Sequence, residues 1–350
     1  MTVFAPPPAR PGPVRPAPLG AAPVRQAPHG PEPTYYELPA IKPSLWGWKV
    51  SGYMFLGGVA GSAQIIATMA EAGGTGQFSS VVRNGRFLAL GGAMLGAPLL
   101  IIDLHTPQRW YNMFRIFRRT SPMSIGTYVL TVFGLSSAVL AGLEWAKLRG
   151  NVPAALSGAG AVARVPAVVS GAAMSTYTAA LLSATSNPLW GSAPRLIAAL
   201  FGVSAMASAG SALALAEQLG GGGEQGRQAL SHVVVTASIV ELAISRLLKR
   251  RFAEAQVEGA LRDTGWGAVY AIGPLALGCG MPLLHQLAGL VEKRRSPVAA
   301  FATGVAVLAG GLMLRHVLLR AGNASASRRP RDYFRFTRGG AATADRSAGR

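Results

Sequence analysis

The sequence predicts an all-α membrane protein, a bundle of eight transmembrane helices. Half of the 350 residues are apolar and only 13% are charged, about half the charged fraction of an average soluble domain. Glycine contributes 44 residues, and glycine is more frequent in membrane-spanning helices than in soluble ones. The uncharged residues form long runs that are separated by basic segments. Lipid is therefore the expected solvent for most of the chain.

Eight uncharged stretches reach or approach the length of about 20 helical residues that crosses the hydrocarbon core of a bilayer. Only a helix satisfies its own backbone hydrogen bonds in that core, so each stretch is expected to be helical. The predicted spans are residues 50–70, 87–102, 121–143, 165–194, 196–216, 229–245, 264–291 and 296–314. The second stretch is short for a span, and the sixth contains the ionisable Glu241.

Small residues at helical spacing indicate which helices pack at the centre. Gly57 and Gly61 share one face of the first span, and Gly92 and Gly96 share one face of the second. This spacing lets two helix backbones approach closely in lipid. Both helices are therefore expected in the interior of the bundle.

The formal net charge of +19 comes from basic residues that lie mostly between the spans and in the tails. With eight spans both termini share a side, and the tails together with the loops near 105–120, 195 and 246–262 hold most of the 33 lysines and arginines. The positive-inside rule then predicts a bacterial inner-membrane protein with both termini in the cytoplasm. Since topology explains the basic pattern, nucleic-acid binding is not expected.

Two tails flank the predicted bundle of residues 46–322. Residues 1–45 hold more than half of the 24 prolines and predict a disordered, extended cytoplasmic tail. Residues 323–350 are polar and rich in arginine, and we expect a basic C-terminal tail there. No apolar core follows an early basic stretch, so the first span is expected to replace a cleavable signal peptide as the insertion signal.

Cysteine content limits the redox chemistry of the chain. Cys279 is its one cysteine, which excludes an internal disulfide, a cysteine-rich zinc site, a thiolate-held iron–sulfur cluster and a C-x-x-C-H haem attachment. If the chain carries electrons, a partner must hold the metals.

Ionisable side chains inside a span cost several kcal/mol unless they are paired or hydrated, so each is a site hypothesis. Glu241 is the clearest, either as a proton carrier or in a structural ion pair or hydrogen bond. Asp103 ends the second span at the expected cytoplasmic boundary, where it could admit protons or pair with Arg109. Glu241 and Asp103 are the candidate catalytic residues. Residues 109–119 are basic and aromatic, typical of an interfacial helix on anionic headgroups.

Five further residues are candidates for binding a quinone. Glu71, Glu144, His232 and His285 all fall toward the non-cytoplasmic ends of their helices, and carboxylates and imidazoles can exchange protons with a quinone carbonyl. The alternative for the two glutamates is a solvated position at the membrane interface. Tyr177, in the fourth span, could donate a hydrogen bond to a ligand carbonyl or to a backbone carbonyl.

Four runs of residues resemble the NrfD / polysulfide reductase membrane-subunit family. They are WGWKVSGYMFLGGVAGSAQ (46–64), IIDLHTPQRWYNMFRIFRRTSPMSIGTYVL (101–130), YTAALLSATSNPLW (177–190) and RHVLLRAG (315–322). The Asp-Leu-x-x-Pro-x-Arg stretch followed by Ser-Pro-Met-Ser is the most specific part. The likeness spans nearly the whole predicted bundle.

The resemblance implies an eight-helix bundle of NrfD-like type that holds no haem or iron–sulfur cluster and binds menaquinone or ubiquinone. It also implies two partners, an iron–sulfur electron-transfer subunit and a catalytic oxidoreductase subunit. The family's quinone site lies toward the outer face; its fourth-helix tyrosine corresponds to Tyr177, and the aspartate of its Asp-Leu-x-x-Pro motif corresponds to Asp103. The chain differs from well-known quinone-binding members in its proline-rich tail, and in Trp46 and Lys49 near the place where an asparagine and a histidine are expected.

The leading interpretation is a quinone-interacting membrane-anchor subunit, without its own metal, of a respiratory oxidoreductase complex. Two alternatives stay open. A b-type cytochrome needs two facing axial histidines, for which His232 and His285 are the one pair within spans. A transporter would be expected to show an inverted repeat and paired broken helices, which the sequence does not display.

Overall fold

The computed structural model describes residues 41–74, 76–104, 106–115, 117–291 and 296–327. Over these residues the secondary structure is helical without strands, and eight segments are long and apolar enough to cross a membrane. The predicted eight-helix fold is confirmed. The segments are α1 (Trp48–Ala72), α2 (Ser79–Ile102), α3 (Pro122–Leu148), α4 (Ala154–Ser183), α6 (Pro194–Leu219), α7 (Glu224–Glu254), the seventh span Trp266–Gly289 and α11 (Pro297–Ala326). Most of the two predicted tails, residues 1–40 and 328–350, lies outside the described residues.

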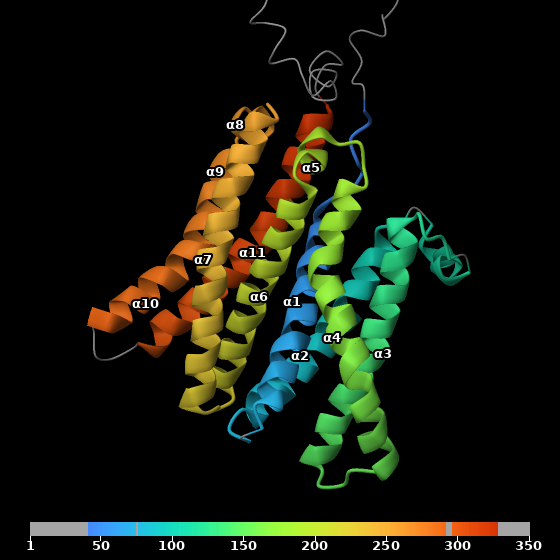
Figure 1. Ribbon diagram of the computed structural model, residues 1–350, viewed down its shortest axis with the longest axis vertical. Coiled ribbons are helices and arrows are strands. Elements are labelled where there is room, and N and C mark those ends of the chain that lie inside the picture. The colour runs from blue at the N-terminus through green and yellow to red at the C-terminus, as the bar shows by residue number, and fades with distance from the viewer. Residues whose placement is uncertain (1–40, 75, 105, 116, 292–295, 328–350) are drawn as a thin grey trace, which may run out of the picture.

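Both ends of the described chain lie at the same end of the bundle, at the top of Figure 1. Ser44 donates to Asn323 Oδ1 from its backbone nitrogen at 3.1 Å and from its hydroxyl at 2.7 Å. The Asn323 amide returns a hydrogen bond to the Ser44 carbonyl at 3.2 Å. We call this the terminal end, and we call the opposite end, which holds the α1–α2, α3–α4 and α6–α7 turns, the distal end.

Several helices extend past the predicted spans. The predicted spans stop at the nearest charged residue, whereas the helices continue through it. α2 begins at Ser79 and includes Arg86, α4 begins at Ala154 and includes Arg164, and α11 continues to Ala326 and includes Arg315. Arg86 and Arg315 are only 1% and 0% exposed. Ending a predicted span at the nearest charge therefore made the predicted segments too short.

The small-residue faces of α1 and α2 make the expected close contacts. A Cβ on Gly61 would overlap the carbonyl oxygen of Gly171 in α4, and a Cβ on Gly92 would lie 2.7 Å from the Ala60 Cβ in α1. α1 is largely buried along its length, as predicted. α2 packs on α1 with one face only, since its Met94 and Leu95 are 66% and 63% exposed.

The seventh span is interrupted, a feature that the sequence analysis did not anticipate. It consists of α9 (Trp266–Tyr270), the π-helical η3 (Ala271–Gly280) and α10 (Met281–Val291). Pro274 inside η3 lacks a backbone donor, which disfavours a regular helix there. A Cβ on Gly310 of α11 would lie 2.6 Å from the Gly278 Cα, so η3 touches α11 backbone to backbone. Beyond this contact α10 diverges from the bundle (Figure 1).

Three runs that carry the family resemblance meet at the terminal end. The α4–α6 connection holds the short helix α5 (Pro188–Ser192), whose Trp190 donates to the Leu318 carbonyl of α11 at 2.9 Å. The Asn187 amide donates to the Gly322 carbonyl at 2.7 Å. Trp46 stacks on Trp190 with ring centroids 6.0 Å apart. These contacts join the start of α1, the α4–α6 connection and the end of α11 into one core.

The remaining short elements lie near the terminal end. η2 (Pro107–Phe114) is a 3-10 helix between α2 and α3 with exposed aromatic side chains, including Trp110 and Tyr111. α8 (Gly259–Arg262) follows α7. The exposed aromatic rings of η2 fit the interfacial helix expected there.

Candidate functional site

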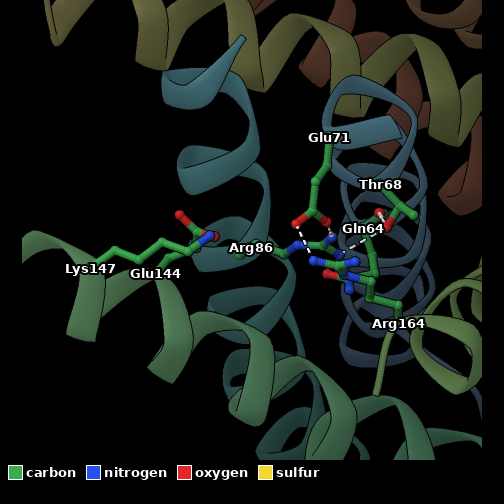
Figure 2. Close-up of polar contacts among 7 residues, drawn as sticks. All are labelled: Gln64, Thr68, Glu71, Arg86, Glu144, Lys147 and Arg164. Atoms are coloured by element: carbon green, nitrogen blue, oxygen red, sulfur yellow. Dashed lines mark hydrogen bonds and ion pairs between the residues drawn. The ribbon is translucent and has the colours of Figure 1, made fainter. Parts of the chain in front are cut away.

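A cluster of charged and polar side chains lies at the distal end, between the first four spans (Figure 2). We call it the distal cluster. Its members are Gln64, Thr68 and Glu71 of α1, Arg86 of α2, Glu144 and Lys147 of α3, and Arg164 of α4. Gln64, Thr68 and Glu71 are spaced by four and three residues, which places them on one face of α1.

Arg86 is the centre of the distal cluster. It donates from Nη2 to Glu71 Oε2 at 2.8 Å and from Nη1 to Thr68 Oγ1 at 2.9 Å. Glu71 also accepts from Arg164 Nη2 at 2.7 Å. A buried guanidinium needs partners of this kind, because its desolvation costs several kcal/mol. Glu71 therefore differs from a solvated interfacial carboxylate, because its two ion pairs join α1, α2 and α4.

Glu144 lies on the α3 side of the cluster. It is 8% exposed and accepts from Lys147 at 2.7 Å, one helical turn away. Its carboxylate also attracts the Arg86 guanidinium. The structure thus brings Glu71 and Glu144 together around Arg86, a residue that the sequence analysis placed outside the second span.

Gln64 is the unsatisfied member of the cluster. Its side chain is 0% exposed, and neither its amide nitrogen nor its amide oxygen has a hydrogen-bond partner among the described residues. Buried polar atoms without partners are rare. Gln64 therefore retains a donor and an acceptor inside the cluster. The sequence analysis quoted Gln64 in the first run without assigning it a role.

An apolar groove of about 690 Å³ runs along the distal half of the bundle between α1, α2, α6 and α7. Its walls include Ile66, Met69, Val203, Met206 and Val240. His232 and Thr236 of α7 are the polar side chains of the lining, and both are exposed in the groove. Ala70 also lines it, so the groove passes directly beside Glu71 on another face of α1.

His285 lies in a different cavity. A polar pocket of about 420 Å³ lies between α6, α7, α10 and α11 at the distal end, and His285 is part of its lining. The two histidines considered as an axial haem pair therefore line different cavities. Within the described ranges no group of three or more histidine, cysteine, aspartate or glutamate side chains is placed to hold a metal ion.

Tyr177 lies toward the terminal end and away from the distal cluster. Its hydroxyl donates to the Pro122 carbonyl in the first turn of α3. Gly126 lies so close to the phenol that a Cβ there would overlap it. The side chain is half-buried. The phenol thus makes the backbone contact that was one of the two predicted roles.

Asp103 and Glu241 lie apart from each other and from the distal cluster. Asp103 follows the last turn of α2 at the terminal end, where it is half-buried. Glu241 is 2% exposed in the middle of α7, opposite Arg315 of α11. The Ser204 hydroxyl of α6 faces the Glu241 carboxylate.

Three oxygen acceptors surround the terminal nitrogens of Arg315. Nη1 donates to the Gly311 carbonyl at 2.6 Å and to Ser204 Oγ at 3.3 Å. Nη2 donates to the Phe201 carbonyl at 3.1 Å. The guanidinium also lies over the Phe201 ring, 5.3 Å from its centroid. Ser204 therefore connects a buried cation with a buried carboxylate inside the membrane.

Residues 39–326 match the family model described as "Polysulphide reductase, NrfD", and the match covers all eight spans. The chain belongs to the NrfD family. A comparison with curated proteins gave no match. Membrane subunits of the NrfD family belong to redox complexes and generally work with iron–sulfur and catalytic subunits. With its eight apolar helices, the chain is a multi-pass integral membrane protein.

One buried acid of this NrfD chain was missed by the sequence analysis. Glu217 in the last turn of α6 is 0% exposed and accepts from Ser80 Oγ at 2.6 Å and from the Asn84 amide at 2.7 Å. The predicted span ends at residue 216, so Glu217 lies just outside it. The signal that could have found it is the serine and asparagine four residues apart in the first turns of α2.

Proposed function

We propose that this NrfD-family chain is the quinone-interacting membrane subunit of a respiratory oxidoreductase complex. In this proposal it exchanges electrons with an iron–sulfur subunit, which in turn serves a catalytic subunit. The observation that carries the proposal is the groove between α1, α2, α6 and α7. Its lining is mostly apolar, and His232 is the ionisable side chain in it.

The groove has the chemistry that an isoprenoid quinone requires. Its apolar walls suit the tail, and its position on the lipid-facing side admits a ligand that arrives from the bilayer. An imidazole can donate a hydrogen bond to a quinone carbonyl, and it can exchange a proton when the carbonyl is reduced. His232 is therefore proposed to hold the headgroup, and the wall around Val203, Met206 and Val240 to receive the tail.

The distal cluster supports proton exchange at the same end of the bundle. Reduction of a quinone to a quinol takes up two electrons and two protons. In this proposal the iron–sulfur subunit supplies the electrons, and ionisable side chains of this chain supply the protons. Glu71 is 24% exposed and follows Ala70 of the groove wall. We propose that Glu71 exchanges protons with the aqueous phase, while its ion pair with Arg86 holds the carboxylate in place.

The proposed orientation follows the basic residues. The terminal end carries Arg118 and Arg119 beyond η2 and Lys249, Arg250 and Arg251 at the end of α7. By the positive-inside rule this end faces the cytoplasm and the distal cluster faces the outer side of the inner membrane. The groove then lies on the side where the family resemblance places a quinone site, whereas Tyr177 lies nearer the cytoplasmic side.

A photoreactive quinone tests the proposal. The complex, purified with its partners, is irradiated with an azido-quinone, and the labelled peptide is identified. Label on α6 and α7 at the groove is expected, and H232L should weaken quinone binding about 2- to 13-fold, the effect of losing one hydrogen bond. H285L changes the histidine of the other cavity, so groove labelling should be unchanged. Label on α3 and α4 beside Tyr177 would contradict the groove as the quinone site and would favour a site at Tyr177.

A further inference from the structure

A second apolar groove, separate from the one proposed for quinone, lies between α2, α3 and η2. Its volume is about 370 Å³. Its lining residues lie within 90–101 of α2 and 127–135 of α3, and Trp110, Met113 and Phe114 of η2 complete it. Because α2 runs from the distal to the terminal end and α3 runs back, these stretches are the terminal halves of both helices. We call this cavity the α2–α3 groove.

The length of the α2–α3 groove matches one leaflet of a bilayer. Residues 90–101 of α2 extend over about 16 Å at a rise of about 1.5 Å per residue. Half of a hydrocarbon core about 30 Å thick is about 15 Å. Thr127 donates to the Met123 carbonyl at 3.1 Å and Thr131 donates to the Thr127 carbonyl at 2.8 Å, so both hydroxyls of the lining are already used within α3. The groove therefore suits an acyl chain.

Gly134 keeps the α2–α3 groove open. It belongs to the lining, and a Cβ built on it would meet no described atom of a neighbouring element within 4 Å. On the other face of α2, by contrast, a Cβ on Gly92 would lie 2.7 Å from the Ala60 Cβ. Gly134 is thus free of a packing role between helices, and a larger side chain at this position would occupy the groove itself.

The segment that contains η2 is held against the start of α3, at the terminal end of the α2–α3 groove. The Tyr128 hydroxyl of α3 donates to the Phe114 carbonyl at 3.1 Å. The Phe117 ring meets the Tyr128 ring edge-on, with centroids 5.1 Å apart. The backbone N–H of Arg118 donates to Ser124 Oγ at 3.1 Å. These contacts position the basic residues of the segment beside the groove.

The connection between α2 and α3 has an excess of positive charge. Its arginines are Arg109, Arg115, Arg118 and Arg119, and its one acid is Asp103. Two of the arginines directly flank the run from Trp110 to Phe114, which supplies the η2 part of the lining. All four arginines are exposed, and within the described ranges none of them forms an ion pair. Unpaired guanidinium groups beside an apolar groove complement an anion that is attached to an acyl chain.

We propose that the α2–α3 groove and these four arginines form a binding site for one anionic phospholipid. One acyl chain lies in the groove, and the phosphodiester lies at the arginines, whose planar guanidinium groups can each donate two hydrogen bonds to phosphate oxygens. A zwitterionic lipid carries a cation next to its phosphate, so the same arginines attract it less. The site is independent of the groove that contains His232, which lies in the distal half of the bundle, and it needs neither quinone nor a partner subunit.

A photoreactive phosphatidylglycerol tests the site on the full-length chain in nanodiscs of phosphatidylcholine. The probe carries a diazirine in one acyl chain and is a small fraction of the lipid, so labelling reports preference over bulk contact. Label is expected within 90–101 and 127–135. R115Q/R118Q should lower this labelling about 10-fold or more, because one basic residue at an anionic surface contributes about 5-fold. G134L fills the groove and should lower the labelling as strongly.

Two matched variants and a second probe complete the test. K249Q/R250Q removes the same charge from the end of α7, on the opposite side of the terminal end in Figure 1, and it should leave the labelling unchanged. G142L makes the glycine change elsewhere on α3, where a Cβ also meets nothing within 4 Å, and it should leave the labelling unchanged. Equal labelling by a phosphatidylcholine probe with the same diazirine would overturn the proposal. Unchanged labelling in R115Q/R118Q or in G134L, or an equal loss in either control variant, would also overturn it.

Discussion

Arg86 of α2 donates to Glu71 of α1 at 2.8 Å, and its side chain is only 1% exposed. The pair joins the two helices at the distal end, beside the groove proposed for quinone. Glu71 also holds the more exposed Arg164 at 2.7 Å, so one carboxylate serves two arginines from two helices. The two ion pairs differ in burial while sharing an acceptor, which makes their energetic contributions separable.

Glu71→Gln is expected to destabilise the bundle by about 3–5 kcal/mol, because it removes the carboxylate that forms the ion pair with the buried Arg86 guanidinium. The measurement is the free energy of unfolding in detergent or lipid. R164M is the matched control: the Arg164 side chain is 44% exposed, and solvent-screened pairs contribute at most about 1 kcal/mol. Equal losses in the two variants would show that Arg86 does not depend on Glu71.

Tyr177→Phe is expected to lower stability by about 1 kcal/mol, because only the hydrogen bond to the Pro122 carbonyl is lost. The ring and its packing remain, so insertion and assembly should persist. If the groove holds the quinone, the affinity of Y177F for quinone should equal that of the parent. A 2- to 13-fold weaker affinity, the loss expected for one hydrogen bond to a quinone carbonyl, would instead place the headgroup at Tyr177.

The two ends of the chain are expected on the same side of the membrane, because Ser44 and Asn323 bind each other at the terminal end. A reporter that is active only in the cytoplasm should be active when it is fused at either terminus. A reporter active only outside the cytoplasm, fused in the α3–α4 turn near Gly150, should report the opposite side. Activity of the cytoplasmic reporter at only one terminus would contradict an eight-span topology.

The sequence was sufficient for the fold because apolar length depends on local composition alone. It was insufficient for the interior charges, because a charge in an apolar run marks either the end of a helix or a buried pair, and only the facing helices decide between the two. Arg86 and Arg315 were assigned to segment ends for this reason, yet their partners come from α1 and from α6. The position of Glu71 and Glu144 near the non-cytoplasmic end could be predicted, because it follows from their place along the first and third spans.

The grouping of the candidate residues depends on which face of each helix they occupy. Residue counting placed His232 and His285 at similar depth, but they line cavities on different sides of α7. Tyr177 lies near the middle of the predicted fourth span, residues 165–194, but α4 starts earlier and ends at Ser183, so Tyr177 lies in the terminal half of the bundle. The break at η3 was missed because residues 264–291 were judged by their uncharged length, without weight for Pro274 inside that stretch.

The last prediction concerns Arg315 and Glu241, which lie buried on facing helices with Ser204 between them. Arg315→Met removes the cation but leaves the Glu241 carboxylate in the interior, and it should destabilise the bundle by about 3–5 kcal/mol. E241Q should cost less, because Arg315 keeps the Gly311 and Phe201 carbonyls as acceptors. The double variant E241Q/R315M carries no unpaired charge, so it should be more stable than R315M alone. Unfolding free energies of the four proteins give the coupling directly, and strict additivity would show that the two charges do not interact.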